Sequence, residues 1–172
     1  GYKLITNGSP EEIEKIVSRI EDMIASETVI PSHFLNHGET PYLNKKQAKF
    51  LERMGFFASP NAKKSGFTDV NMYFRDASNK NTFELQIIGD KSNQVNLKEH
   101  LFYNFKTKGA ATEHGVVNKK MQEIFESMTD LQKEVYEEYV NKCYAYARKI
   151  ELGEQTQKPL LPEGLNKALE LV

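Results

Sequence analysis

One carboxylate stands alone in an apolar stretch. Glu84 lies in the run from Phe83 to Ile88, where alternating apolar and polar residues predict a strand. A carboxylate in a central strand costs several kcal/mol unless it is solvated, paired or bound to a cation. Glu84 is therefore a candidate for chemistry. The alternative is an exposed glutamate on the wet face of an antiparallel sheet, and alternation alone leaves both readings open.

A cationic loop precedes the strand-like stretches. It reads Lys63-Lys64-Ser65-Gly66-Phe67, with two cations and a glycine beside an aromatic ring. This composition suits a loop that holds a phosphate and stacks a base. The alternative is an ordinary solvated lysine-rich loop.

A histidine and a tyrosine share one helical stretch. Glu99 and His100 precede Tyr103 by four and three positions, so the three lie on neighbouring turns. His100 can act as an acid, as a base or as a hydrogen-bond donor to a phosphate. The alternative is a packed or exposed histidine without a role in chemistry. We interpret the single cysteine, Cys143, as a buried packing residue of a helix. The remaining histidines show no zinc-ligand spacing: His33, His37 and His114.

Two strands hold Glu84 in place. Alternating stretches on either side of the turn-rich segment 76–81 predict a β-hairpin. With the apolar sets facing the core, four polar side chains share the opposite face: Asn71, Tyr73, Glu84 and Gln86.

Helices and further strands surround this hairpin. The chain opens with a strand over 2–6, and Ser9-Pro10 then provides a helix start with a capping hydroxyl and a first-turn proline. Downstream, we expect a short strand at 29–30, a loop through Pro31, Gly38 and Pro41, a helix over 44–54 and a loop over 56–65. Beyond Gly89, we expect helices over 97–105, 116–128 and 131–151 and a short terminal helix over 163–171. The predicted class is α/β (α+β), a mixed sheet flanked by helices.

Composition limits the possible partners. The 23 lysines and arginines nearly balance the 24 aspartates and glutamates, so global charge favours neither DNA nor a membrane as partner. No apolar run approaches the roughly 20 residues that span a bilayer. A single cysteine forms no intramolecular disulfide, and we expect a cytoplasmic protein. The oligomeric state stays open, a homo-oligomer included.

Three motifs, taken in order, resemble the RelA/SpoT-type (p)ppGpp synthetase (GTP pyrophosphokinase) family. They are the segments 65–71 and 83–87 and the pair Glu99-His100 with Tyr103. The opening residues 1–5 also look like the strand that follows the family's aspartate-x-x-glycine metal motif. The resemblance implies a partial synthetase domain over 1–108, whose N-terminal ATP-binding part is missing, with 109–172 as a helical extension packed on it.

The resemblance implies a fold, a reaction and a set of site residues. The fold would be nucleotidyltransferase-like, and the reaction would transfer pyrophosphate from ATP to the 3′-hydroxyl of GDP or GTP with Mg²⁺. Glu84 matches the family's carboxylate and would be both catalytic residue and magnesium ligand. Phe67 stands at the guanine-stacking position. The other expected nucleotide-binding residues are Ser65, Asn71, Gln86, His100 and Tyr103. Lys63 and Lys64 are also expected to bind the nucleotide, as phosphate contacts, on their composition alone.

Departures from the family pattern leave alternatives. Phe67 lacks the hydroxyl of the family's tyrosine, and Asn71 stands where the family commonly has histidine. The chain begins at the glycine that follows the family's basic ATP-binding segment and first metal aspartate, so we expect this chain to be inactive in synthesis. One alternative is a degenerate regulatory module that binds a guanine nucleotide or a protein. Others are a toxin-like synthetase with a different nucleotide or RNA acceptor, and a chance match in an unrelated α/β domain.

Overall fold

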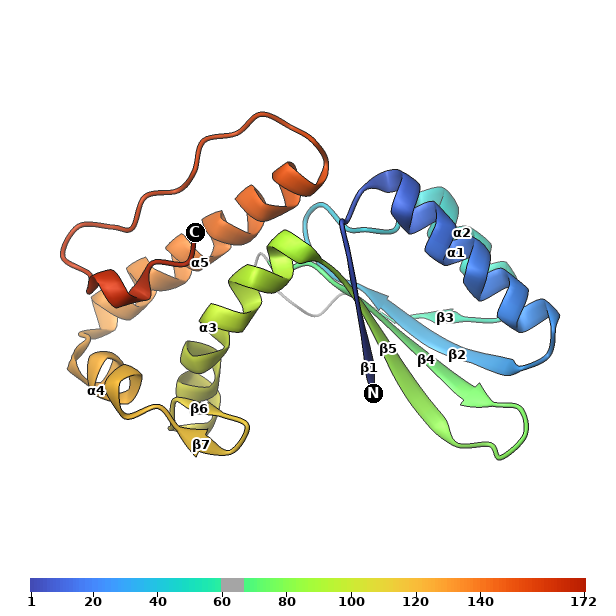
Figure 1. Cartoon of the computed structure of the whole chain (residues 1–172), viewed down its shortest axis with the longest axis horizontal. Coiled ribbons are helices and arrows are strands. Elements are labelled where there is room, and N and C mark those ends of the chain that lie inside the picture. Colours follow the sequence, from blue (N-terminus) through green and yellow to red (C-terminus); the bar gives the residue numbers. More distant parts are fainter. Residues whose placement is uncertain (60–66) are drawn as a thin grey trace.

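A mixed five-stranded sheet and two groups of helices form the molecule (Figure 1). The computed structural model describes residues 1–59 and 67–172. The strands are β1 (Tyr2–Thr6), β2 (Val29–Asn36), β3 (Phe57–Ala58), β4 (Val70–Asp76) and β5 (Thr82–Gly89), with a small hairpin of β6 (Thr112–Glu113) and β7 (Val116–Val117). The helices are α1 (Pro10–Ala25), α2 (Lys45–Arg53), α3 (Asp90–Lys108), α4 (Lys119–Ser127), α5 (Asp130–Glu151) and the 3₁₀ turn η1 (Lys167–Leu169). The predicted α+β class is confirmed.

The sheet has the order β1-β5-β4-β2-β3. β5 lies between β1, which runs parallel to it, and β4, which is antiparallel and forms the predicted hairpin with it. β2 pairs antiparallel with β4 and parallel with β3. Glu84 therefore lies in a central strand, as predicted.

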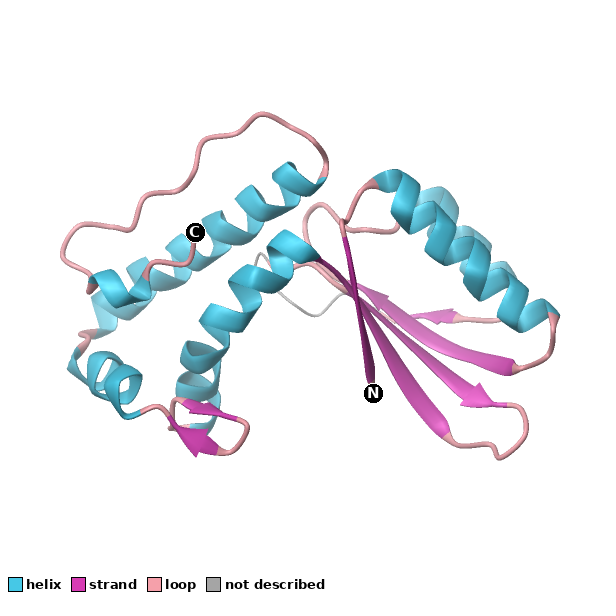
Figure 2. Cartoon of the chain, viewed as in Figure 1, coloured by secondary structure: helices cyan, strands magenta, loops and turns pink. Residues whose placement is uncertain are grey.

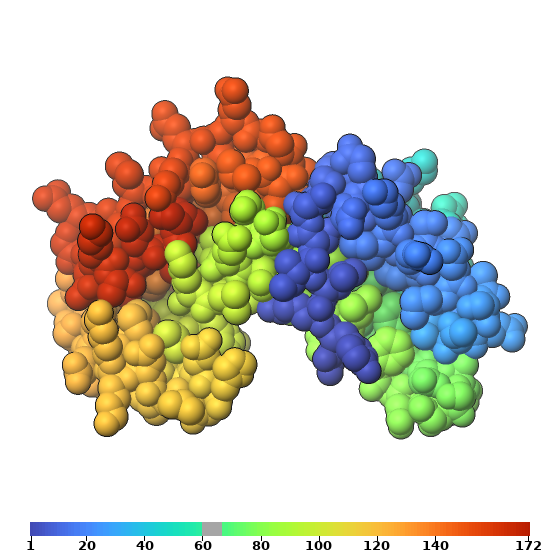
Figure 3. Space-filling model, viewed as in Figure 1, coloured from blue at the N-terminus to red at the C-terminus, as the bar shows by residue number. Residues whose placement is uncertain are grey.

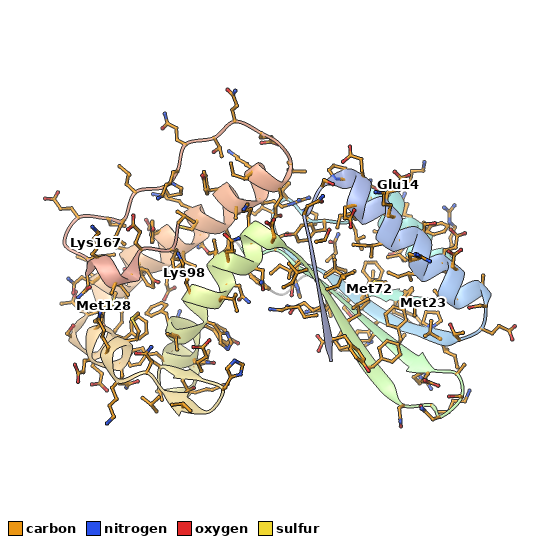
Figure 4. The ribbon with its side chains drawn as sticks, viewed as in Figure 1. Glu14, Met23, Met72, Lys98, Met128 and Lys167 are labelled. Atoms are coloured by element: carbon orange, nitrogen blue, oxygen red, sulfur yellow. The ribbon has the colours of Figure 1, made fainter. Side chains whose placement is uncertain are left out.

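Helices α1 and α2 cover one face of the sheet (Figure 2). Ser9 caps α1 by accepting a hydrogen bond from the Glu12 N–H, so this helix begins where the sequence predicts. One stripe of α1 packs on the inward side chains of the strands, and Figure 4 shows Met72 between sheet and helix. The buried residues of this core include Ile13, Val17, Ile20, Val70, Met72 and Phe74. The other face of the sheet carries the polar side chains of Asn71, Tyr73, Glu84 and Gln86.

A second core lies between α3 and α5. The ring of Phe102 lies in this core and contacts the rings of Phe125 and Tyr136. Cys143 is buried there, as predicted, and this burial raises the pKa of its thiol to about 11. The second core draws on α3 as well as on residues beyond 108, and the predicted division at residue 108 stays a prediction.

Arg148, near the end of α5, joins the helices to the sheet. Its guanidinium donates to the carbonyl oxygens of Gly8, at 2.7 Å, and Thr40, at 3.0 Å. The same group lies 4.2 Å from the ring centre of Tyr42, a cation–π distance. Because these carbonyls follow β1 and β2, Arg148 fixes α5 against the ends of two strands.

The β2 segment differs from the expectation. Instead of a short strand and a loop through Pro31, β2 continues to Asn36. Pro31 has no N–H to donate, and β2 tolerates it because β3 pairs only with His33 and Phe34. On the other side, the pairing with β4 shifts register between Pro31 and Phe34. The predicted loop over 56–65 contains β3, and its remainder from 60 onwards lies outside the described residues.

Three C-terminal elements also differ in extent. α3 is longer than the predicted 97–105, and α4 begins at Lys119 because Val116 and Val117 pair with β6 instead. His114 and Gly115 both have positive φ, the backbone geometry of a tight hairpin turn. The terminal segment forms only the turn η1, anchored by buried Leu169 and Leu171. Within the described residues, no helix is long and apolar enough to cross a membrane.

Candidate functional site

A groove of about 640 Å³ lies where the polar sheet face meets α3 and α5. Figure 3 shows the molecule hollowed between β1 and the side formed by α3 and the β6–β7 hairpin. Three separate segments bring predicted site residues to the groove: Phe67, Gln86, His100 and Tyr103. The structure therefore gathers four side chains that lie far apart in the sequence.

Regular elements position most of these side chains. Gln86 projects from β5, and its β1 partner Lys3 lines the groove beside it. His100 and Tyr103 lie on adjacent turns of α3, with ring centres 6.0 Å apart and planes 20° apart. Side chains on strands and helices are held more rigidly than those on loops, so the groove is largely preformed.

Phe67 forms an aromatic wall of the groove. It is half-buried, and its ring meets the ring of Tyr144 edge-on, with centres 5.3 Å apart and planes 79° apart. Tyr144 comes from α5 and also lines the groove. An exposed face of such a ring can stack on a nucleobase.

Two carboxylates line the groove, Glu99 and Glu137, and Glu99 is the one with a shifted pKa. Burial raises the pKa of its carboxyl, while the hydrogen bond from the Tyr144 hydroxyl, at 3.3 Å, acts in the opposite direction. Burial also lowers the pKa of His100, and the nearby positive charges of Lys108 and Lys3 lower it further. The groove thus favours a neutral imidazole at its rim.

Two lysines supply positive charge. The Lys3 ammonium donates to Asn93 Oδ1 at 3.0 Å, and Lys106 forms an ion pair with Glu137 at 2.5 Å. Both line the groove. Lysines in these positions can attract phosphate groups, although each already has one partner.

Glu84 lies on the same sheet face but outside this groove. Its register partner Tyr73 donates the phenol hydroxyl to Glu84 Oε1 at 3.0 Å, and His33 stacks on Tyr73 with ring centres 4.1 Å apart. Glu84 borders a separate open hollow together with Gly1 and Tyr73. Because residues i and i+2 of a strand share a face, Glu84 and Gln86 are neighbours along β5.

The predicted polar face of four side chains is present. Asn71 pairs in register with Gln86, and Tyr73 pairs with Glu84. Asn71 itself is buried, and its Oδ1 accepts no hydrogen bond from any residue that the structure describes. It therefore lies beneath the groove surface and does not line it.

Within residues 1–59 and 67–172, no three His, Cys, Asp or Glu side chains are grouped so as to hold a metal ion. Magnesium usually needs only one or two carboxylates when nucleotide phosphates complete its ligand shell. Glu84 fits that arrangement as one protein ligand. Of the other predicted residues, Lys63, Lys64 and Ser65 lie outside the described part of the chain.

Several groove residues escaped the sequence interpretation. None of these residues carries a motif of its own: Lys3, Asn96, Lys106 and Tyr144. Lys3 enters the groove through the pairing of β1 with β5, and the other three enter it through the packing of α3 and α5. Helical spacing offered one signal, because Asn96, Glu99, His100 and Tyr103 follow the three-four pattern of a single helix face.

Fold and site together define an α+β protein with an open polar sheet face and an aromatic groove beside it. A scan against protein-family models matched none, and searches of curated proteins and of solved structures found no match.

Proposed function

We propose that the groove binds a purine nucleotide as the acceptor in a pyrophosphate transfer of the RelA/SpoT type. The observation that carries the proposal is the meeting of Phe67, Gln86, His100 and Tyr103 in one groove. The family resemblance predicts that these four residues bind the acceptor nucleotide. They come from three segments, so their meeting is a property of the fold.

The groove chemistry suits a nucleotide. The Phe67 ring offers a surface for stacking a base, and Lys3 and Lys106 offer positive charge to phosphates. Gln86 and Glu99 offer hydrogen-bond acceptors to N–H or O–H groups of the ligand. GDP and GTP are the proposed acceptors, and ATP is the proposed donor.

Glu84 is the proposed catalytic carboxylate. Its place beside Gln86 puts it within reach of a ligand that extends along the sheet face, where a carboxylate can take a proton from an attacking hydroxyl. Bound Mg²⁺ would neutralise phosphate oxygens, with Glu84 as its protein ligand. Tyr73 holds this carboxylate through its hydroxyl.

A second candidate is binding without chemistry. Glu84 lies outside the groove and already accepts a hydrogen bond from Tyr73. This separation favours a module that holds a guanine nucleotide and acts through the bound state. For either candidate the proposed compartment is the cytoplasm, where nucleotides are abundant and the thiol of Cys143 stays reduced.

Calorimetric titration tests the nucleotide site. GDP, GTP and ATP, each with magnesium, are titrated into the wild type and into Phe67→Leu, which keeps apolar volume but removes the ring. We expect guanine-nucleotide affinity to fall about tenfold or more, since base stacking contributes about 1–3 kcal/mol. Phe57→Leu is the matched control, because Phe57 is 78% exposed on β3. A folded chain that binds none of the three nucleotides would contradict the proposal.

Glu84→Gln separates the two candidates. If the protein is a transferase, this variant loses transfer activity when both proteins are measured with the family's ATP-binding segment joined to the N-terminus. The affinity of the variant for GDP without magnesium stays within about twofold of the wild type. If wild-type protein binds GDP but transfers nothing under any of these conditions, the binding module is favoured.

A further inference from the structure

A buried histidine–aspartate pair lies behind the groove. His37 Nδ1 and Asp69 Oδ1 are 2.5 Å apart, and the His37 backbone N–H donates to the Asp69 carbonyl oxygen at 2.9 Å. Both residues are buried. Gly38 has φ +103°, and a Cβ there would lie 2.3 Å from Thr68 Oγ1, so the segment after His37 is packed tightly against the start of β4. The pair is therefore held by a backbone and a side-chain hydrogen bond in a tightly packed place.

Asp69 reaches the groove through Gln86. Gln86 Nε2 donates to Asp69 Oδ2 at 2.8 Å, so the two carboxylate oxygens hold His37 and Gln86 respectively. A carboxylate can only accept hydrogen bonds. The amide nitrogen of Gln86 must therefore face Asp69, because the opposite orientation would set two acceptors against each other in a buried place.

This orientation leaves the other end of the amide for a ligand. Gln86 lines the groove, and its Oε1 accepts no hydrogen bond from the residues that the structure describes. Asn71, its register partner, also carries an acceptor without a donor in the described structure. Gln86 is therefore the groove-lining acceptor at this point, and Asn71 lies buried behind it.

We propose that His37 and Asp69 are positioning residues that fix the Gln86 carbonyl toward the groove, so that the ligand must present a hydrogen-bond donor there. The inference rests on the proposed nucleotide site and adds a rule of selectivity to it. On a nucleotide, the donor is a base N–H or a ribose hydroxyl. A ligand that presents only acceptors to Gln86 is disfavoured, because a turned amide would set its oxygen against the Asp69 carboxylate.

Reversing donor and acceptor in the hydrogen bond between Gln86 and Asp69 tests the proposal. In Asp69→Asn, the His37 N–H holds the Asn oxygen, and the Asn amide nitrogen then faces Gln86. Gln86 must turn its carbonyl inward and present its NH₂ to the groove. We expect GDP affinity to fall about tenfold, the effect of one mismatched hydrogen bond. Gln86→Glu alone sets two carboxylates together and has a similar effect.

The double variant Asp69→Asn/Gln86→Glu restores the arrangement. The Asn amide nitrogen donates to the Glu carboxylate, which again presents an acceptor to the groove, and GDP affinity returns to within about threefold of wild type. Asp22→Asn/Gln155→Glu makes the same chemical changes at exposed positions and serves as the matched control. A purely structural role of Asp69 predicts no such rescue. Unchanged GDP affinity in Asp69→Asn, or no recovery in a folded double variant, overturns the proposal.

A measurement without ligand keeps this inference separate from the proposed function. In NMR spectra of ¹⁵N-labelled protein, the Gln86 side-chain NH₂ should exchange slowly with solvent in the wild type and rapidly in Asp69→Asn. If the wild type binds no GDP but shows this difference, the nucleotide proposal fails and the positioning pair stands. Rapid solvent exchange of the Gln86 NH₂ in the wild type refutes the proposal that Asp69 holds this amide, even if GDP binds.

Discussion

The Tyr42 hydroxyl donates a hydrogen bond to Oε2 of Glu151 at 2.7 Å, although the two residues lie 109 positions apart. The other oxygen of this carboxylate accepts from the Ser92 N–H at 2.8 Å, in the first turn of α3. The Gly89 N–H donates to the Tyr42 hydroxyl at 2.8 Å. Glu151 therefore holds the end of β5, the start of α3 and the end of α5 together, and these elements set the walls of the groove.

Loss of the Glu151 charge should destabilise the whole molecule. Arg148 and Glu151 have side chains 5% and 0% exposed, with Nη1 and Oε2 at 3.5 Å, so Glu151→Gln leaves a buried guanidinium without its counter-ion. We expect the free energy of unfolding to fall by about 3–5 kcal/mol. Urea unfolding followed by circular dichroism measures the change. Glu134→Gln, exposed on α5, should change it by less than about 0.5 kcal/mol.

Gly89 should not tolerate a methyl group. Its φ of −70° suits any residue, but a Cβ would lie 2.1 Å from Glu151 Oε1. We expect Gly89→Ala to destabilise by about 1–3 kcal/mol because the carboxylate must move. In the Glu151→Ala background the same change should cost much less. Equal costs in the two backgrounds would show that the close approach is not the cause.

Glu99 should make stability fall as pH rises. Burial raises the pKa of this carboxyl in the folded state, so between its unfolded and folded pKa values the folded protein binds more protons than the unfolded chain. The stabilisation is complete below the unfolded pKa and is lost as pH rises through the folded pKa. Glu99→Gln should flatten this decline in urea unfolding measured over a pH series. Glu113→Gln, at an exposed position, should leave the slope unchanged.

The Tyr73 phenol should report on Glu84. Burial is the main cause of its raised pKa, and the hydrogen bond to Glu84 raises it further. In Glu84→Gln the pKa should therefore move toward the ordinary tyrosine value without reaching it. NMR titration of protein labelled with ¹³C-tyrosine follows this change. A Tyr73 pKa that does not respond would mean that the contact with Glu84 is not formed in solution.

Signals that act within a few residues were sufficient for much of the fold. Ser9 caps α1 as predicted, and α2 and α5 begin within one residue of the predicted starts, where Asn44 and Thr129 cap them. Each cap accepts a hydrogen bond from the backbone N–H three positions later. The β4–β5 hairpin and its polar face followed from alternation and a turn-rich segment. The Glu84–Gln86 face was predictable for the same reason, since strand periodicity alone decides which side chains share a face.

Contacts between distant segments decided the rest. α3 begins at Asp90 although its N-cap is Gly89, because Glu151, 59 positions away from Ser92, accepts the N–H that a local cap would otherwise bind. β2 extends through Pro31 because its neighbours leave that position unpaired on one side. The groove and the His37–Asp69–Gln86 chain depend on side chains from separate elements, and pairing across such distances leaves no periodic pattern in the sequence.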